Sequence, residues 1–181
     1  MDLIGDMMRA LAFLSRLPVP QRWFDGYTGA LAGTVRGFPL AGMIIALPAA
    51  LVLLIAFLLD LPELVAALLA VMALVVTTGA LHEDGLADVA DGFYGGSSPE
   101  RRLEIMKDSA IGAYGMLALV FSVLLRTALL AEILDALAIL PALLVVIGTE
   151  AVSRAVLVKF WQTLPSARMH GVAGQAGTPA A

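Results

Sequence analysis

The sequence predicts an all-α, polytopic integral membrane protein with about four transmembrane helices and an N-terminal interfacial helix. Its 181 residues are 60% hydrophobic and only 14% charged, and the mean hydropathy is +0.93. These values are typical of membrane proteins and exclude an ordinary soluble domain. Long apolar runs flank one densely charged segment. We therefore expect residues 1–181 to form a single membrane-embedded domain.

Charge and cysteine content narrow the functional classes. The net charge of −4 is small and no basic stripe is present, so nucleic-acid binding is not expected. The absence of cysteine excludes disulfides and thiolate metal sites. We predict no removable signal peptide, because the first apolar stretch carries Arg9 and Arg16 and lacks a small-residue cleavage pattern.

Residues 1–37 are predicted to form an interfacial helix and a loop. Apolar side chains recur at helical spacing in this helix, over residues 3–14: Leu3, Met7, Leu11 and Leu14. This pattern predicts an amphipathic helix that lies on the membrane surface; a lid over the charged segment is the alternative role. Pro18 and Pro20 end the helix, and Trp23 and Tyr27 suit the lipid headgroup level.

Four apolar runs in residues 38–160 predict the membrane spans, at about 38–59, 64–81, 111–131 and 137–160. Such runs are long enough for a hydrocarbon core of about 30 Å. Acidic turns at 60–63 and 132–135 are expected to join the spans within each pair. The charged segment, residues 82–108, joins the second span to the third. Residues 161–181 are expected to form a flexible tail.

The basic residues predict the orientation. Apart from two arginines inside the spans, they lie before the first span, between the second and third, and at or after the end of the fourth: Arg9, Arg16, Arg22, Arg36, Arg101, Arg102, Lys107, Lys159 and Arg168. The positive-inside rule therefore predicts that both termini and the charged segment face the cytoplasm, in a bacterial inner membrane.

Three charged residues fall within or at the ends of the predicted spans. Arg126, Glu150 and Arg154 should face protein or a water-filled cavity, because burying charge in lipid is costly. Glu150 and Arg154 stand at i and i+4, which favours a structural ion pair that locks two helices; a direct catalytic role, such as contact between Arg154 and a phosphate, is the alternative.

The charged segment begins with His82-Glu-Asp-Gly-Leu-Ala-Asp-Val-Ala-Asp-Gly92. In a helix, Asp84, Asp88 and Asp91 project within about 60° of one another. Their repulsion is relieved by a bound cation, and oxygen ligands favour Mg²⁺, which also binds substrate phosphates. The simpler interpretation is a solvated acidic face at the end of a membrane helix.

Such a cluster suits phosphoryl-type transfer, because a cation there stabilises charge on a diphosphate. Glu104 and Asp108, also at i and i+4, are a candidate second carboxylate face for a two-metal site. His82 is a candidate general base; a hydrogen-bonding role suits its place at a helix boundary equally well. Nearby arginines can hold phosphates through a bidentate fork.

The motif His82-x-Asp84-Gly-Leu-Ala-Asp88-x-x-Asp91-Gly92, followed by Arg101-x-Leu-Glu-Ile-Met-Lys-Asp108-Ser and Gly112-x-Tyr-Gly115, resembles the cobalamin synthase family, the adenosylcobinamide-GDP ribazoletransferases. Phe13-Leu-Ser-Arg-Leu-Pro-Val-Pro20 and Phe38-Pro-Leu-Ala-Gly42 resemble the opening segments of that family. The resemblance covers nearly everything from residue 10 to about 160.

The resemblance implies a membrane enzyme of the last stage of vitamin B12 assembly. The family joins adenosylcobinamide-GDP to α-ribazole or its 5′-phosphate and releases GMP, with Mg²⁺ as cofactor. The resemblance assigns the matching carboxylates to metal: Asp84, Asp88, Asp91 and Asp108. It assigns Arg101 and Lys107 to substrate phosphate. A homo-oligomer is compatible with the resemblance.

One departure and three alternatives remain. The family usually continues with further membrane helices, whereas this chain passes into a tail of small residues after Arg168. CDP-alcohol phosphotransferases carry an Ala-Arg pair after the glycine, where Phe93 and Tyr94 stand here. A membrane prenyltransferase needs a second Asp-rich motif. A divalent-cation transporter needs carboxylates near the bilayer midplane, whereas these are predicted at a cytoplasmic end.

Overall fold

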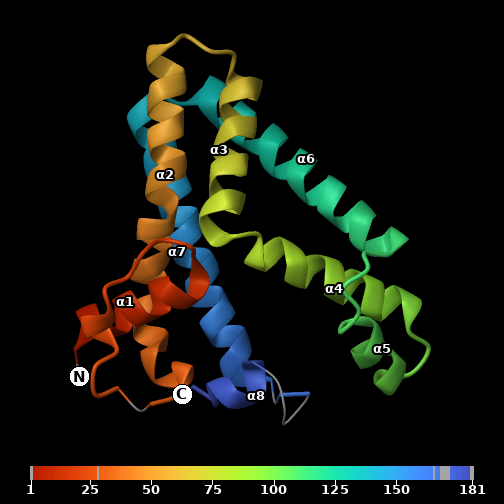
Figure 1. Cartoon of the computed structure of the whole chain (residues 1–181). Coiled ribbons are helices and arrows are strands. Elements are labelled where there is room, and N and C mark those ends of the chain that lie inside the picture. Colours follow the sequence, from red (N-terminus) through yellow and green to blue (C-terminus); the bar gives the residue numbers. More distant parts are fainter. Residues whose placement is uncertain (1, 28, 165, 168–171, 180–181) are drawn as a thin grey trace.

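The computed structural model describes residues 2–27, 29–164, 166–167 and 172–179, and it confirms the all-helical prediction: no strand occurs in those ranges (Figure 1). The helices, in chain order, are α1 (Leu3–Leu14), η1 (Gln21–Trp23), η2 (Leu31–Gly37), α2 (Phe38–Leu58), α3 (Glu63–Thr78), α4 (Leu81–Gly95), α5 (Pro99–Ile105), α6 (Ala113–Ala136), α7 (Ile139–Thr163) and α8 (Val172–Ala176).

Length and composition agree with a polytopic membrane protein. Three described stretches are long and apolar enough to cross a membrane: η2 with α2, α6, and α7. A fourth span results if α3 and α4, which meet at an angle of 89°, together count as one. The α2–α3 and α6–α7 connections lie at one end of the molecule, and α1, α4, α5 and both termini lie toward the other (Figure 1). The predicted cytoplasmic orientation of the second end stays a prediction.

The predicted ends of two spans are wrong. The expected turn at 132–135 is helical, and α6 continues to Ala136 because no glycine or proline interrupts it there. The second span ends at Thr78 rather than residue 81, because Gly79 and Ala80 both take left-handed backbone conformations. The chain bends at these two residues, so α4 runs away from the axis of α3.

The predicted tail at 161–181 is described only in part. Helix α7 extends into it as far as Thr163, and α8 occupies Val172–Ala176. Arg168, which contributed to the predicted orientation, lies outside the described residues.

Helix α2 is the centre of the packing. Its alanines at 41, 46 and 49 are fully buried, so neighbouring helices approach its backbone closely, as small residues allow in membrane helix pairs. At Gly42 the approach is very close, because an added Cβ would lie 2.5 Å from the carbonyl oxygen of Glu150 on α7. This contact holds the middle of α7, with its charged pair, against α2.

Helix α1 forms where predicted, but half of its apolar stripe does not face the membrane. Leu11 and Leu14 are buried against Phe38 and Ile45 of α2, whereas Leu3 is half exposed. The reason is that burying both leucines against α2 removes their apolar surface from water without contact with lipid.

The segment after α1 supports the bend between α3 and α4. The Arg16 backbone N–H donates to the carbonyl of Thr77 at 2.8 Å. The Arg16 side chain covers Gly79, where an added Cβ would lie 2.4 Å from Nε. The proline-containing N-terminal motif therefore helps to place the first turn of α4, which carries the charged segment.

Candidate functional site

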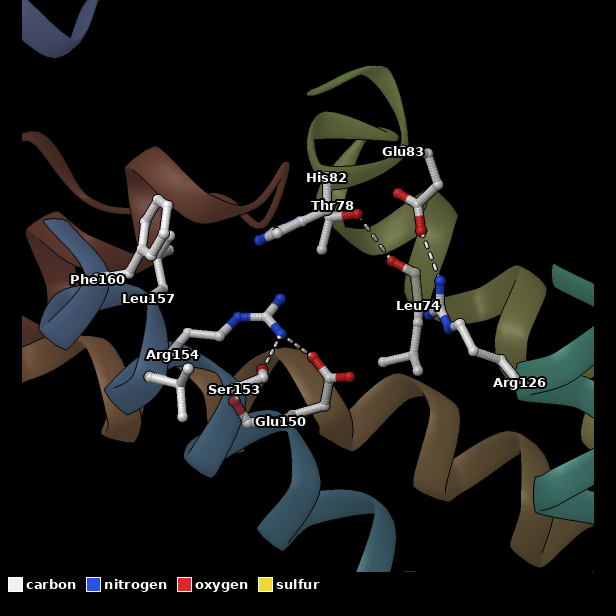
Figure 2. A pocket seen from close by; sticks show the side chains of 11 residues that line it. Leu74, Thr78, His82, Glu83, Arg126, Glu150, Ser153, Arg154, Leu157 and Phe160 are labelled. Atoms are coloured by element: carbon white, nitrogen blue, oxygen red, sulfur yellow. Dashed lines mark hydrogen bonds and ion pairs between the residues drawn. The ribbon is translucent and has the colours of Figure 1, made fainter. Parts of the chain in front are cut away.

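A cavity of about 430 Å³ lies where the end of α3, the start of α4, the middle of α6 and the second half of α7 meet. Its lining residues are Leu74, Thr78, His82, Glu83, Arg126, Glu150, Ser153, Arg154, Val156, Leu157 and Phe160 (Figure 2). The cavity therefore gathers the charged residues of the spans around the first turn of the charged segment.

The predicted pair of Glu150 and Arg154 is confirmed. The Arg154 guanidinium donates to the Glu150 carboxylate and, at 2.8 Å, to the hydroxyl of Ser153. Arg154 is only 5% exposed, so the pair neutralises a charge that would otherwise be costly to bury. The guanidinium Nε, however, is buried without a hydrogen-bond partner in the described part of the chain. One strong donor thus remains available to a ligand.

A second ion pair, which was not predicted from the sequence, lies on the side of the cavity opposite Arg154 (Figure 2). Arg126 of α6 donates to Glu83 of α4 at 2.8 Å. The other carboxylate oxygen of Glu83 is buried, and among the described residues it has no hydrogen-bond partner. An arginine inside an apolar span indicates that an acidic partner exists, but a separation of 43 positions in the chain conceals which residue it is.

His82 occupies the first turn of α4 and points into the cavity beside Arg154 (Figure 2). Helix α4 is short and polar, and lies outside the three long apolar stretches. Burial, reinforced by the positive charge of Arg154, lowers the pKa of His82 below its usual value of 6.5. The imidazole is therefore neutral at pH 7 and able to accept a proton.

The three predicted aspartates of α4 have different surroundings. Asp84 is exposed and Asp88, one turn later, is half-buried. Asp91 is buried and faces α6, where its two oxygens accept the backbone N–H groups of Gly112 at 2.7 Å and Gly115 at 2.8 Å. Because these amides lie at the positive end of α6, the Asp91 carboxylate caps that helix and ties it to α4.

Gly115→Ala is expected to loosen the junction of α4 and α6. The added Cβ would lie 2.3 Å from an Asp91 carboxylate oxygen and 3.0 Å from the carbonyl oxygen of Ala87. We expect a loss of about 2 kcal/mol of stability from this overpacking, read as a lower Tm in detergent. Gly85→Ala is the matched control, because nothing lies within 4 Å of its added Cβ. Equal Tm values for the two variants would contradict the Asp91 cap.

The predicted second carboxylate face is wrong. Helix α5 ends at Ile105, so Asp108 lies beyond it in a turn, where its carboxylate accepts the backbone N–H of Ala110 at 3.1 Å. Glu104 instead pairs with Arg101 at 2.6 Å. The physical reason is that local turn hydrogen bonds satisfy Asp108 better than another helical turn would. The prenyltransferase alternative thereby loses its second motif.

The predicted phosphate ligands are exposed, and the predicted metal ligands form no group of three within the described ranges. Arg101 and Lys107 are exposed on and just after α5. No three histidine or acidic side chains within the described ranges lie close enough together to hold a metal ion. The assignment of Asp84, Asp88, Asp91 and Asp108 to one metal site stays a prediction, and the structure separates Asp91, as a helix cap, from the other members.

Comparisons with known proteins agree over almost the whole chain. The family described as "Cobalamin-5-phosphate synthase" matches residues 6–180. Proteins named adenosylcobinamide-GDP ribazoletransferase from Brucella ovis and Brucella anthropi are 54% and 51% identical to this chain, over 98% of its length and 68% of theirs. No solved structure matches. Because the family match covers residues 6–180, the chain belongs to the cobalamin-5-phosphate synthase family.

Proposed function

We propose that the protein is an adenosylcobinamide-GDP ribazoletransferase of cobalamin biosynthesis. In the reaction, a ribose hydroxyl of α-ribazole or its 5′-phosphate forms a bond to the phosphorus attached to cobinamide. The bond from that phosphorus to the phosphate of GMP breaks, and GMP leaves with the electron pair. The observation that supports the proposal is the position of the first residue of the family motif: His82, in the first turn of α4, lines the cavity.

We propose His82 as the group that accepts the hydroxyl proton. It lines the cavity, and its lowered pKa keeps it unprotonated at pH 7. A neutral imidazole in hydrogen-bond reach of a hydroxyl is a suitable general base. The role of Arg154 beside it is to supply positive charge near the phosphates as negative charge develops there.

We propose Mg²⁺ as the cofactor, with Asp84 and Asp88 as its protein ligands. The donor set fits, because Mg²⁺ in such enzymes keeps several waters and is typically bound by one or two carboxylates and substrate phosphates. A cluster of three protein ligands is thus not required. When bound, the ion would neutralise charge on the diphosphate. Arg101 and Lys107, which are exposed nearby in sequence, are proposed to contact the outer phosphate.

We propose a bacterial inner-membrane location with α4 and α5 facing the cytoplasm. The support is the predicted distribution of lysine and arginine together with the two-ended arrangement of the connections. Soluble phosphorylated substrates are then on the side where this charged segment lies.

His82→Gln tests the proposed reaction. With detergent-solubilised protein, adenosylcobinamide-GDP and α-ribazole 5′-phosphate, we expect the unaltered chain to release GMP. We expect the variant to lose about 10²-fold or more in kcat, as for removal of a general base, with little change in KM for either substrate. GMP formation is followed by chromatography.

Two results would contradict this proposal in different ways. An unaltered kcat in His82→Gln would remove His82 from the chemistry and leave the reaction in place. Absence of GMP release from the unaltered chain, folded and supplied with Mg²⁺, would contradict the proposed activity of the chain itself.

A further inference from the structure

The cavity beside His82 has one polar end and one apolar end. Glu83 and Arg154 face the polar part from opposite sides, whereas Leu157 and Phe160 of α7 supply the apolar end (Figure 2). Figure 2 shows the Arg154 guanidinium and His82 imidazole extending into the same space, with Phe160 farther along α7. A ligand with a flat apolar part and a hydroxyl-bearing part matches this division.

The volume of the cavity restricts which part of the two substrates can bind in it. Its volume of about 430 Å³ lies in the usual range for small-ligand sites, roughly 300–1,000 Å³. A nucleoside is of suitable size for such a space. The corrin macrocycle of adenosylcobinamide-GDP is far larger than a nucleoside and has to lie outside.

The unpaired polar atoms define the chemistry of the ligand. Nε of Arg154 is a buried donor and one oxygen of Glu83 is a buried acceptor, and neither is paired with another described residue. Leaving such groups unpaired in a buried site is costly. A ribose offers what both need, because a hydroxyl donates one hydrogen bond and accepts others.

The apolar end distinguishes the two nucleosides of the reaction. The dimethylbenzimidazole base of ribazole has one acceptor nitrogen and no donor, so it can lay its methyl-bearing ring against Leu157 and Phe160 with few hydrogen bonds lost. Guanine has several donors and acceptors along its edge, which would be left unpaired against the same side chains. The apolar end thus favours ribazole over the guanosine of GDP.

From these observations we infer that the cavity is the binding site of the nucleophilic substrate, with the ribazole base against Phe160 and Leu157 and the ribose between Glu83 and Arg154. The inference rests on the proposed function and adds to it the position of one substrate. It places a ribose hydroxyl at the end of the cavity where His82 lies.

Direct binding to the complete chain in detergent tests the inference without turnover. We expect isothermal titration with α-ribazole to give saturable binding, and Phe160→Ala to weaken it about tenfold, as loss of base stacking on an aromatic ring does. Phe121→Ala is the matched control, because Phe121 is 65% exposed, close to the 61% of Phe160, and does not line the cavity. This control is expected to bind α-ribazole as the unaltered chain does.

Glu83→Gln is the second variant, because Phe160 tests only the apolar end. Glutamine keeps one oxygen for Arg126 and replaces the other oxygen with a donor. We expect it to weaken α-ribazole binding and to raise KM for α-ribazole, with KM for adenosylcobinamide-GDP unchanged. Titration with α-ribazole 5′-phosphate, run in parallel, shows whether the phosphate adds to the affinity.

The inference is overturned if Phe160→Ala and Glu83→Gln both bind α-ribazole as tightly as Phe121→Ala. It is also overturned if GMP displaces α-ribazole, since the guanosine would then occupy the cavity. Loss of GMP release by the unaltered chain with α-ribazole binding intact would count against the proposed function and leave the inference standing.

Discussion

Asp88→Asn is expected to abolish GMP release, with a fall in kcat of about 10³-fold, comparable to the loss of a group that stabilises transition-state charge. The substitution keeps the size of the side chain and removes the negative charge that Mg²⁺ requires of its ligands. Asp84→Asn, one helical turn earlier on the exposed side of α4, should have a similar effect. The assay measures GMP over a range of Mg²⁺ concentrations.

The control for this prediction removes the same charge elsewhere. Asp135 is exposed near the end of α6 that joins α7, far along the helix from the junction with α4, so Asp135→Asn should leave activity unchanged. Mn²⁺ binding, followed by its electron paramagnetic resonance signal, gives a second measurement. Full activity and unaltered metal binding in Asp88→Asn would remove Asp88 from the proposed metal site.

Gly42→Ala is expected to cause a large loss of stability. Its added Cβ would lie 2.5 Å from the carbonyl oxygen and 2.9 Å from the carbonyl carbon of Glu150. These are backbone atoms of a buried helix contact, so no side-chain rotation relieves the clash, and α2 and α7 must separate. We expect a loss of about 3 kcal/mol, which corresponds to a fall in Tm of about 6 °C or more for a chain of this size.

The matched control lies on α7 itself. Gly148 has no neighbour within 4 Å of an added Cβ, so Gly148→Ala should be neutral or slightly stabilising, since alanine favours a helix by up to about 1 kcal/mol over glycine. Both variants are compared by thermal unfolding in the same detergent. A Tm for Gly42→Ala equal to that of Gly148→Ala would show that α2 and α7 are not in contact there.

Local features of the structure could be predicted from the sequence because their causes are local. Long apolar runs predict membrane helices, and the i, i+4 spacing of Glu150 and Arg154 predicts their ion pair. The helical form of the acidic motif follows in the same way. Helix ends were less predictable: the turn expected at 132–135 is helical, since acidic residues alone do not terminate a helix.

The roles of individual carboxylates depended on contacts that sequence spacing does not reveal. Asp84, Asp88 and Asp91 look equivalent on a helical projection, but Asp91 is buried and accepts from two amides of α6, whereas Asp84 is exposed. Asp108 matches the i, i+4 pattern with Glu104, but α5 ends before it. In each case a nearby backbone group competes for the carboxylate, and the path of the chain decides which group is near.

The sequence by itself determined the fold class, the family resemblance and the motif on α4, because composition, periodicity and motif spacing are properties of neighbouring residues. Only the tertiary structure decided the cavity: the Glu83–Arg126 pair, the left-handed bend at Gly79 and the packing of Gly42 on Glu150 join segments far apart in the chain. The physical reason is that burial of charge and close packing depend on which helices meet, and that is a property of the whole chain.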